Sequence, residues 1–141
     1  MSEYVRVPLR REVRQRARQR CEYCLLHEDD AFLPHEPDHI VAVKHGGPTS
    51  AENLAWTCFV CNRAKGSDIA SVDPETGEIV RLFSPRCDEW TTHFLLTEDA
   101  LLVGKTPSGR AASRLLQYND PRQVEIRQIL VDAGLYPPSS E

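Results

Sequence analysis

The sequences CEYC, residues 21–24, and CFVC, residues 58–61, decide the fold of this chain. Each is a C-x-x-C pair, and two such pairs on turns can present four thiolates to one tetrahedral Zn²⁺ ion. A single pair would also be compatible with redox chemistry or with chance, but two pairs in one short chain favour zinc. Four protein ligands leave no open coordination position, so the predicted zinc is structural and clamps the ends of residues 25–57. The predicted ligands are Cys21, Cys24, Cys58 and Cys61.

The composition is compatible with one small domain or with a domain that carries an extension. The chain has 141 residues, of which 40% are hydrophobic, so it can form a packed core. No apolar run approaches the roughly 20 residues that a membrane helix needs, and the N-terminus lacks the apolar region of a signal peptide. The cysteine count is five, and an odd count argues against a disulfide framework. We therefore expect a cytoplasmic protein without a membrane partner, and the oligomeric state stays open.

The charge is distributed unevenly along the chain. The net charge is −4, yet residues 1–20 contain seven arginines and two glutamates. Pro8 and the following LRREVRQRARQR predict a basic N-terminal helix that runs into the first cysteine pair. Arg10, Arg14 and Arg18 are spaced by four residues, which would align them on one face of this helix. Such a face can contact nucleic acid, but it can equally be a solvated surface, so both interpretations stay open.

The segment between the cysteine pairs contains candidate catalytic residues, a carboxylate and an imidazole side by side. In EPDHIVAVKHGG, residues 36–47, Asp38 and His39 begin a predicted strand over 38–43, and Gly46-Gly47 predicts a turn. The segment NLAWTC, residues 53–58, predicts a second short strand. A short helix is expected to follow from Cys61. A strand that only filled a core would not begin with a carboxylate and an imidazole.

The combination of DHI, GG, ENL and CxxCNxxK resembles the HNH endonuclease family, with its ββα-metal core, over roughly residues 18–67. The resemblance implies that His39 is the general base and that Asn53 orients the loop without touching metal. It further implies that Asp38 and Asn62 bind the catalytic metal. Many family members have His at the last position, so Asn62 makes this chain an H-N-N variant. Both implied ligands donate oxygen, which favours Mg²⁺ or Mn²⁺ at the catalytic site.

Further basic residues follow the second cysteine pair. Lys65 lies three residues after Asn62, so it can share a helical face with it and contact a phosphate. Arg63 is a weaker candidate for the same role, and a solvated Lys65 is the alternative. The leading hypothesis is a metal-dependent endonuclease that acts on DNA, most simply double-stranded DNA. The alternatives are a non-catalytic, zinc-stabilised nucleic-acid-binding module and an interaction protein whose C-terminal half binds a partner.

The predicted fold class is α+β. Residues 1–70 are predicted to form the nuclease module with its zinc knuckles, and 71–141 an α/β extension that packs on it. In the extension, DPETGE, residues 73–78, predicts a hairpin, and strands are expected over 90–96 and 100–104. Two helices should follow, the second with Asp120 as its cap and Gly134 after its end. The expected core face of this second helix comprises Val124, Ile126, Ile129, Leu130 and Ala133.

Overall fold

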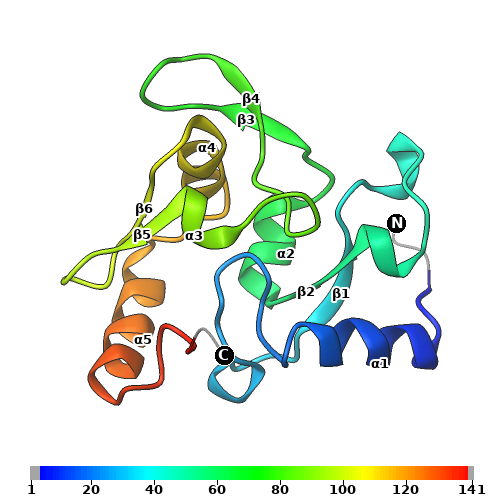
Figure 1. Ribbon diagram of the computed structural model, residues 1–141, viewed down its shortest axis with the longest axis horizontal. Coiled ribbons are helices and arrows are strands. Elements are labelled where there is room, and N and C mark those ends of the chain that lie inside the picture. Colours follow the sequence, from blue (N-terminus) through cyan, green and yellow to red (C-terminus); the bar gives the residue numbers. More distant parts are fainter. Residues whose placement is uncertain (1–3, 140–141) are drawn as a thin grey trace. The chain divides into compact units, whose positions relative to one another are not determined.

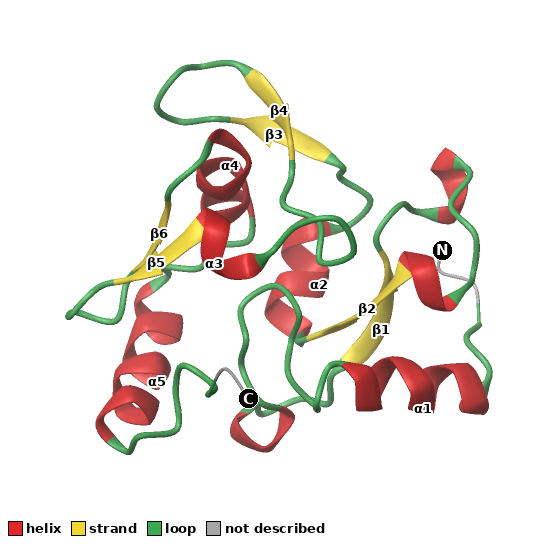
Figure 2. Cartoon of the chain, viewed as in Figure 1, coloured by secondary structure: helices red, strands yellow, loops and turns green. Residues whose placement is uncertain are grey.

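The computed structural model describes residues 4–139 and confirms the α+β class (Figures 1 and 2). Within the described residues, contacts divide the chain into two compact units. Unit 1 extends to Ile69 and also includes Ser84–Asp88, whereas unit 2 comprises Ala70–Phe83 and the chain from Glu89 onward. The grouping of Ser84–Asp88 with unit 1 is a feature that the sequence did not indicate.

Unit 1 consists of a short antiparallel ribbon with a helix on each side of it in the sequence. Its elements are α1 (Val7–Arg16), η1 (Glu28–Asp30), β1 (Glu36–His39), η2 (Val43–His45), η3 (Ala51–Asn53), β2 (Leu54–Thr57) and α2 (Phe59–Lys65). In the ribbon, Asp38 pairs with Ala55 and His39 pairs with Leu54. The order β1, β2, α2 places the end of β1 next to the helix that carries the second cysteine pair, and α2 contacts β1.

Helix α1 packs on the ribbon through a small apolar core. Val13 is fully buried and clusters with Leu54 and Trp56. Pro8 occupies the first turn, where its missing N–H leaves no intrahelical bond unmade. The helix ends at Arg16, and Arg18 follows with a φ of 55°. The expected helical alignment of arginines therefore does not extend to Arg18.

The predicted strand over 38–43 is wrong in its position. β1 ends at His39 instead of beginning there, and the chain bends at Ile40 and Val41. The physical reason is that the Asn53 side chain accepts a hydrogen bond from the Val41 N–H and donates one to the Val41 carbonyl. Since a side chain bonds these groups, Val41 does not continue the ladder with β2.

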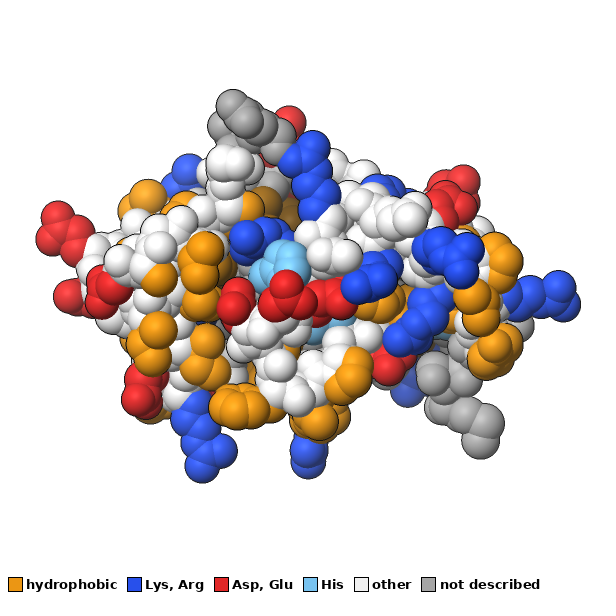
Figure 3. Space-filling model, turned by 90° about the horizontal axis from the view of Figure 1, so that it is seen from below, with side chains coloured by type: hydrophobic (Ala, Val, Ile, Leu, Met, Phe, Trp, Pro, Cys, Tyr) orange, Lys and Arg blue, Asp and Glu red, His pale blue; other side chains and the backbone are white. Residues whose placement is uncertain are grey.

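No helix within residues 4–139 is both long and apolar enough to cross a membrane. The surface instead carries many charged side chains. Figure 3 shows Asp and Glu side chains lying among Lys and Arg side chains on the face that it views. The net charge of −4 is therefore the sum of interspersed charges of both signs.

Unit 2 contains two further antiparallel ribbons and three helices. Its elements are β3 (Ala70–Val72), β4 (Ile79–Arg81), α3 (Trp90–His93), β5 (Phe94–Leu96), β6 (Leu102–Gly104), α4 (Pro107–Leu115) and α5 (Pro121–Asp132). The predicted hairpin around 73–78 joins β3 to β4. The strand expected over 90–96 is only partly correct, because Trp90–His93 is helical and the strand begins at Phe94.

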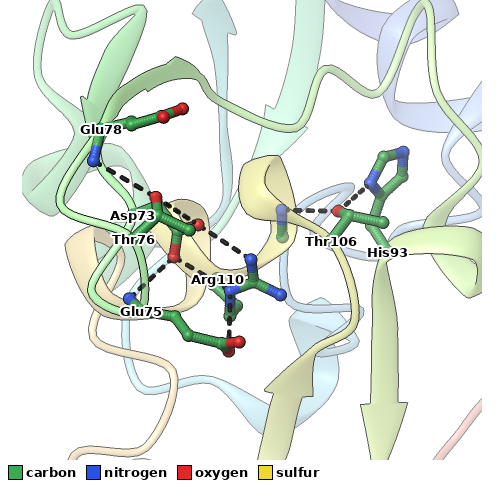
Figure 4. Close-up of polar contacts among 8 residues, drawn as sticks. Asp73, Glu75, Thr76, Glu78, His93, Thr106 and Arg110 are labelled. Carbon is green, nitrogen blue, oxygen red and sulfur yellow. Dashed lines mark hydrogen bonds and ion pairs between the residues drawn. The ribbon is translucent and has the colours of Figure 1, made fainter.

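A buried ion pair fixes the β3–β4 turn to α4 within unit 2. Figure 4 shows the Asp73 carboxylate between Arg110 and the backbone and side chains of its own turn. Arg110 donates two hydrogen bonds to Asp73, at 2.9 and 2.8 Å, and the Glu75 N–H and the Thr76 hydroxyl donate to the same carboxylate. These hydrogen bonds, with that from Arg110 the strongest, hold the pKa of Asp73 well below its ordinary value.

Helix α5 begins as the sequence predicts but buries a different face. The Asp120 side chain accepts a hydrogen bond from the Arg122 N–H, and Gly134 follows the helix with a φ of 75°. Ile129 was expected in the core, but it is 62% exposed. Arg127 is buried instead, because its guanidinium donates to backbone carbonyls, among them that of Ala100 at 2.6 Å. The hydrophobic pattern of α5 predicts that Ile129 is buried, but Arg127 is the buried residue because its hydrogen bonds compensate for the loss of water.

Candidate active site and metal centres

The four predicted zinc ligands form one buried cluster. Their sulfur atoms all lie within 4.8 Å of one another. The Sγ atoms of Cys24 and Cys58, one from each pair, are 3.7 Å apart. A tetrahedral site with Zn–S bonds of about 2.3 Å separates its sulfurs by about 3.8 Å. The geometry therefore fits a structural zinc ion.

In each cysteine pair, a backbone N–H donates a hydrogen bond to the first sulfur, which favours the ionised thiolate that binds a cation. The Cys24 N–H donates to Cys21 Sγ, and the Cys61 N–H donates to Cys58 Sγ, each at 3.4 Å. Hydrogen bonds among the thiols, together with burial, raise the pKa of Cys24 and of Cys61 well above the ordinary value. The hydrogen bonds from its three neighbours lower the pKa of Cys58. A bound divalent ion would supply the positive charge that allows all four sulfurs to ionise.

A residue inside the first knuckle connects it to β2 and to the returning segment 84–88. The Glu22 carboxylate accepts a hydrogen bond from the Trp56 N–H at 2.7 Å and forms an ion pair with Arg86. The Glu22 N–H in turn donates to the Trp56 carbonyl. Sequence reasoning missed both Glu22 and Arg86, because their pairing joins segments that are far apart in the chain.

A pocket of about 360 Å³ lies where the end of β1 faces α2. It brings together three of the predicted site residues, Asp38, His39 and Asn62. The other lining residues are Ala42, Val43, Lys44, Gly66 and Ser67. Carboxylate and amide oxygens thus meet an imidazole in one small cavity, and this donor set fits a hard divalent ion such as Mg²⁺ or Mn²⁺.

The His39 ring is buried and oriented by a hydroxyl. The residue is 5% exposed, and its Nε2 atom lies 2.8 Å from Thr49 Oγ1. Thr49 follows the Gly46-Gly47 turn, and nothing in the sequence singled it out. Because one ring nitrogen is fixed by a hydrogen bond, the imidazole has a defined orientation at the pocket.

Asn53 clamps the loop that forms one wall of the pocket. Its Nδ2 donates to the carbonyls of Val41 and Pro48 at 2.9 and 2.8 Å, and its Oδ1 accepts from the Val41 N–H at 3.0 Å. Gly47 lies against this clamp, since a Cβ at this position would be 1.8 Å from the Val41 carbonyl oxygen. Asn53 therefore holds the loop and is not among the residues that line the pocket.

Lys65 is buried behind the pocket, where it contacts the two catalytic candidates of β1. The residue is 3% exposed, and its Nζ donates to the His39 carbonyl at 3.0 Å. The same Nζ lies 3.2 Å from Asp38 Oδ2. Burial raises the pKa of Asp38, and the charge of Lys65 opposes this shift. In the structure the Lys65 ammonium is thus engaged inside unit 1. The expected contact between Lys65 and a phosphate stays a prediction.

Comparison with known proteins agrees with this geometry. Residues 21–68 match the family model described as HNH endonuclease. This segment is therefore similar to the HNH endonuclease family. No curated protein and no solved structure matches the chain. The matched segment, called the HNH segment below, contains both cysteine pairs and all residues that line the pocket, and its similarity suggests a nuclease or nucleic-acid-related function.

The N-terminal arginines that were predicted to contact nucleic acid, Arg10, Arg14 and Arg18, lie outside the HNH segment, and the first two of them are bound to it. Arg10 pairs with Glu36 at 2.6 Å, and its guanidinium lies 5.3 Å from the centre of the Trp56 ring. Arg14 donates two hydrogen bonds to the Glu28 carboxylate, at 2.9 and 2.8 Å. These hydrogen bonds from Arg14 are the main cause that lowers the pKa of Glu28. Both arginines therefore attach α1 to the HNH segment.

The remaining predicted contacts are more accessible. Arg63 is exposed, and its guanidinium lies 5.9 Å from the centre of the Phe59 ring. Arg18 is also exposed. Lys44, which the sequence did not single out, is exposed at the rim of the pocket in η2. A nucleic-acid role for Arg18 and Arg63 stays a prediction, and Lys44 is an additional candidate.

Proposed function

We propose that this chain is a metal-dependent endonuclease that hydrolyses phosphodiester bonds in double-stranded DNA. The observation that carries the proposal is the pocket in which Asp38, His39 and Asn62 converge within the HNH segment. A binding protein would not need an imidazole beside two oxygen donors of this kind. The buried cysteine cluster supports the proposal further, because it anchors α2, the helix that carries Asn62.

Each residue of the pocket has a role in the proposal. His39 removes a proton from the attacking water, and Thr49 keeps the imidazole ring in position for this step. Asp38 and Asn62 hold one Mg²⁺ or Mn²⁺ ion. When bound, this ion neutralises charge on the phosphate and on the leaving oxygen. Asn53 keeps the loop with Lys44 closed against the end of β1, so that Lys44 is placed to contact a phosphate.

The ion pair between Lys65 and Asp38 favours one alternative function. If Lys65 neutralised Asp38 permanently, the pocket would hold no divalent ion, and the chain would be a zinc-stabilised nucleic-acid-binding module. The two functions differ in one observable property, since only the enzyme cleaves the DNA that it binds.

A plasmid assay tests the proposal. Zinc-loaded wild type, His39→Ala, Asp38→Ala and Asn62→Ala are incubated with supercoiled DNA in Mg²⁺, Mn²⁺ or EDTA. His45→Ala is the matched control, because His45 is an exposed histidine of η2 that does not line the pocket. We expect metal-dependent nicking by wild type and the control, with a loss of about 10²-fold or more in His39→Ala. Equal nicking by all variants would refute the site, and salt-dependent DNA retention without nicking would establish the binding module.

We also propose an assignment for the chain as a whole. Residues 1–70 form the nuclease module, which Ser84–Asp88 join, and the rest of residues 71–141 forms a C-terminal extension. A buried cluster of four cysteines assigned to zinc is in keeping with a reducing compartment such as the cytoplasm, which we propose as the location.

A further inference from the structure

Lys65 is a buried cation that the proposed reaction leaves unexplained. Its ammonium contacts the Asp38 carboxylate and the His39 carbonyl, but Lys65 does not line the pocket. Lys65 therefore contacts Asp38 without being part of the wall of the pocket. Asp38 Oδ2 is buried and has no hydrogen-bond partner, so its ion pair with Lys65 is the interaction that balances its charge.

The charges around the pocket leave no net negative charge for a divalent ion. Asp38 is the acidic residue among those that line the pocket, and Lys65 already neutralises it. Lys44 adds a second positive charge at the rim. A divalent ion that enters this site alone would have to share the Asp38 carboxylate with the buried Lys65 ammonium. The two cations would repel each other strongly, because water does not screen charges in a buried site.

We propose that Lys65 is the resident counter-cation of Asp38 and makes divalent-ion binding conditional on a nucleic-acid phosphate. The inference rests on the proposed catalytic metal site. Sites for Mg²⁺ commonly combine one or two carboxylates with oxygens of a substrate phosphate. A phosphate in the pocket supplies the negative charge that Asp38 cannot, so the ion and the nucleic acid bind cooperatively.

The position of Lys65 allows its charge to be removed without removing its packing. Lys65 is the last residue of α2, and the start of this helix is held by Cys58 and Cys61 of the cysteine cluster. Methionine has nearly the same shape as the buried lysine stem but no charge. Lys65→Met therefore tests the charge, and Lys105→Met is the control, since it removes an equal charge from an exposed position that does not line the pocket.

The experiment measures Mn²⁺ affinity by electron paramagnetic resonance on the full, zinc-loaded chain, with and without a short DNA duplex. All proteins carry His39→Ala so that the DNA stays intact, and an additional Asp38→Ala variant gives the background from Mn²⁺ on DNA. Without DNA, we expect Lys65→Met to bind Mn²⁺ about 10-fold more tightly than the parent, a typical coupling between sites. DNA should tighten Mn²⁺ binding about 10-fold in the parent and only slightly in Lys65→Met. Lys105→Met should change the DNA-free affinity by less than about threefold, because an exposed charge is screened.

Several outcomes would overturn the inference. One is equal DNA-free affinity in the parent and Lys65→Met, and another is an equal gain in Lys105→Met. Zinc content and circular dichroism show whether Lys65→Met folds. If it does not fold, the parent protein still provides a test, because a Mn²⁺ affinity that is the same with and without DNA would refute the conditional binding. Mn²⁺ binding that requires Asp38 but ignores Lys65 would refute only this inference. Absence of Mn²⁺ binding in every protein would refute the proposed metal site as well.

Discussion

Replacing Asn53 by alanine should open the wall of the pocket while the rest of unit 1 stays folded. The side chain makes three hydrogen bonds, two to Val41 and one to Pro48, and the residue is 8% exposed. At about 1 kcal/mol for each bond, the substitution removes about 3 kcal/mol from the closed state of the loop. This free energy corresponds to about a hundredfold in the equilibrium between closed and open loop.

Hydrogen exchange of single amides measures this opening. The Val41 N–H bonds to the Asn53 side chain, whereas the Ile40 N–H bonds to the Asn53 backbone carbonyl at 2.8 Å. In Asn53→Ala, the protection of Val41 should fall by up to about a hundredfold, while Ile40 keeps most of its protection. Plasmid nicking should fall by about 10²-fold, because the loop with Lys44 is no longer placed. Unchanged protection at Val41 would refute the clamp, and an equal loss at Ile40 would show global loosening instead.

Three further predictions concern the zinc cluster and the ion pairs of each unit. Cys61→Ser, or chelation of zinc from the wild type, should unfold unit 1, because binding of a structural zinc ion contributes about 10–16 kcal/mol to folding. Zinc release and Trp fluorescence measure the unfolding, and a unit 1 that stays folded without zinc would contradict the prediction. Arg14 lowers the pKa of Glu28 from its ordinary 4.5, so the stability from this pair is complete above that pH and is lost as the pH falls through the lowered pKa. Glu28→Gln should therefore reduce stability at neutral pH and flatten the acid limb of the unfolding curve, and an unchanged limb would exclude the pair as its source. Arg110→Met should lower the melting temperature, because it leaves the buried Asp73 carboxylate without its cation. Adding Asp73→Asn removes that charge and should restore part of the melting temperature. A double variant that melts no higher than Arg110→Met would refute this coupling.

The features that the sequence predicted correctly depend on local rules. The cysteine pairs are recognised by their spacing, and the cap of α5 by the sequence Asp120-Pro121. The hairpin around 73–78 follows from turn-forming residues between two short apolar segments. In each case the residues that determine the structure lie within a few positions of one another, so the pattern is visible without the fold.

The features that the sequence did not predict depend on partners far away in the chain. Nothing in the sequence indicated that the Lys65 ammonium donates to the carbonyl of His39, 26 residues earlier. Nor did it indicate that the Arg14 guanidinium donates to the carboxylate of Glu28, 14 residues later. A basic side chain has the same sequence signature in an internal ion pair and on a binding surface, and only the fold shows which acid it meets.

The position of Asn62 shows how the two metal centres depend on each other. Helix α2 has only seven residues, and a helix this short is not stable by itself in water. Cys58 and Cys61 fix its first turn in the cysteine cluster, and Lys65 fixes its last residue to β1. Asn62 lies between these two attachments, directly after Cys61, so its place beside Asp38 in the pocket depends first on the cysteine cluster. Loss of the structural zinc should therefore abolish Mn²⁺ binding at the pocket even though no cysteine lines it, and Lys65→Met should preserve that binding because the zinc attachment remains.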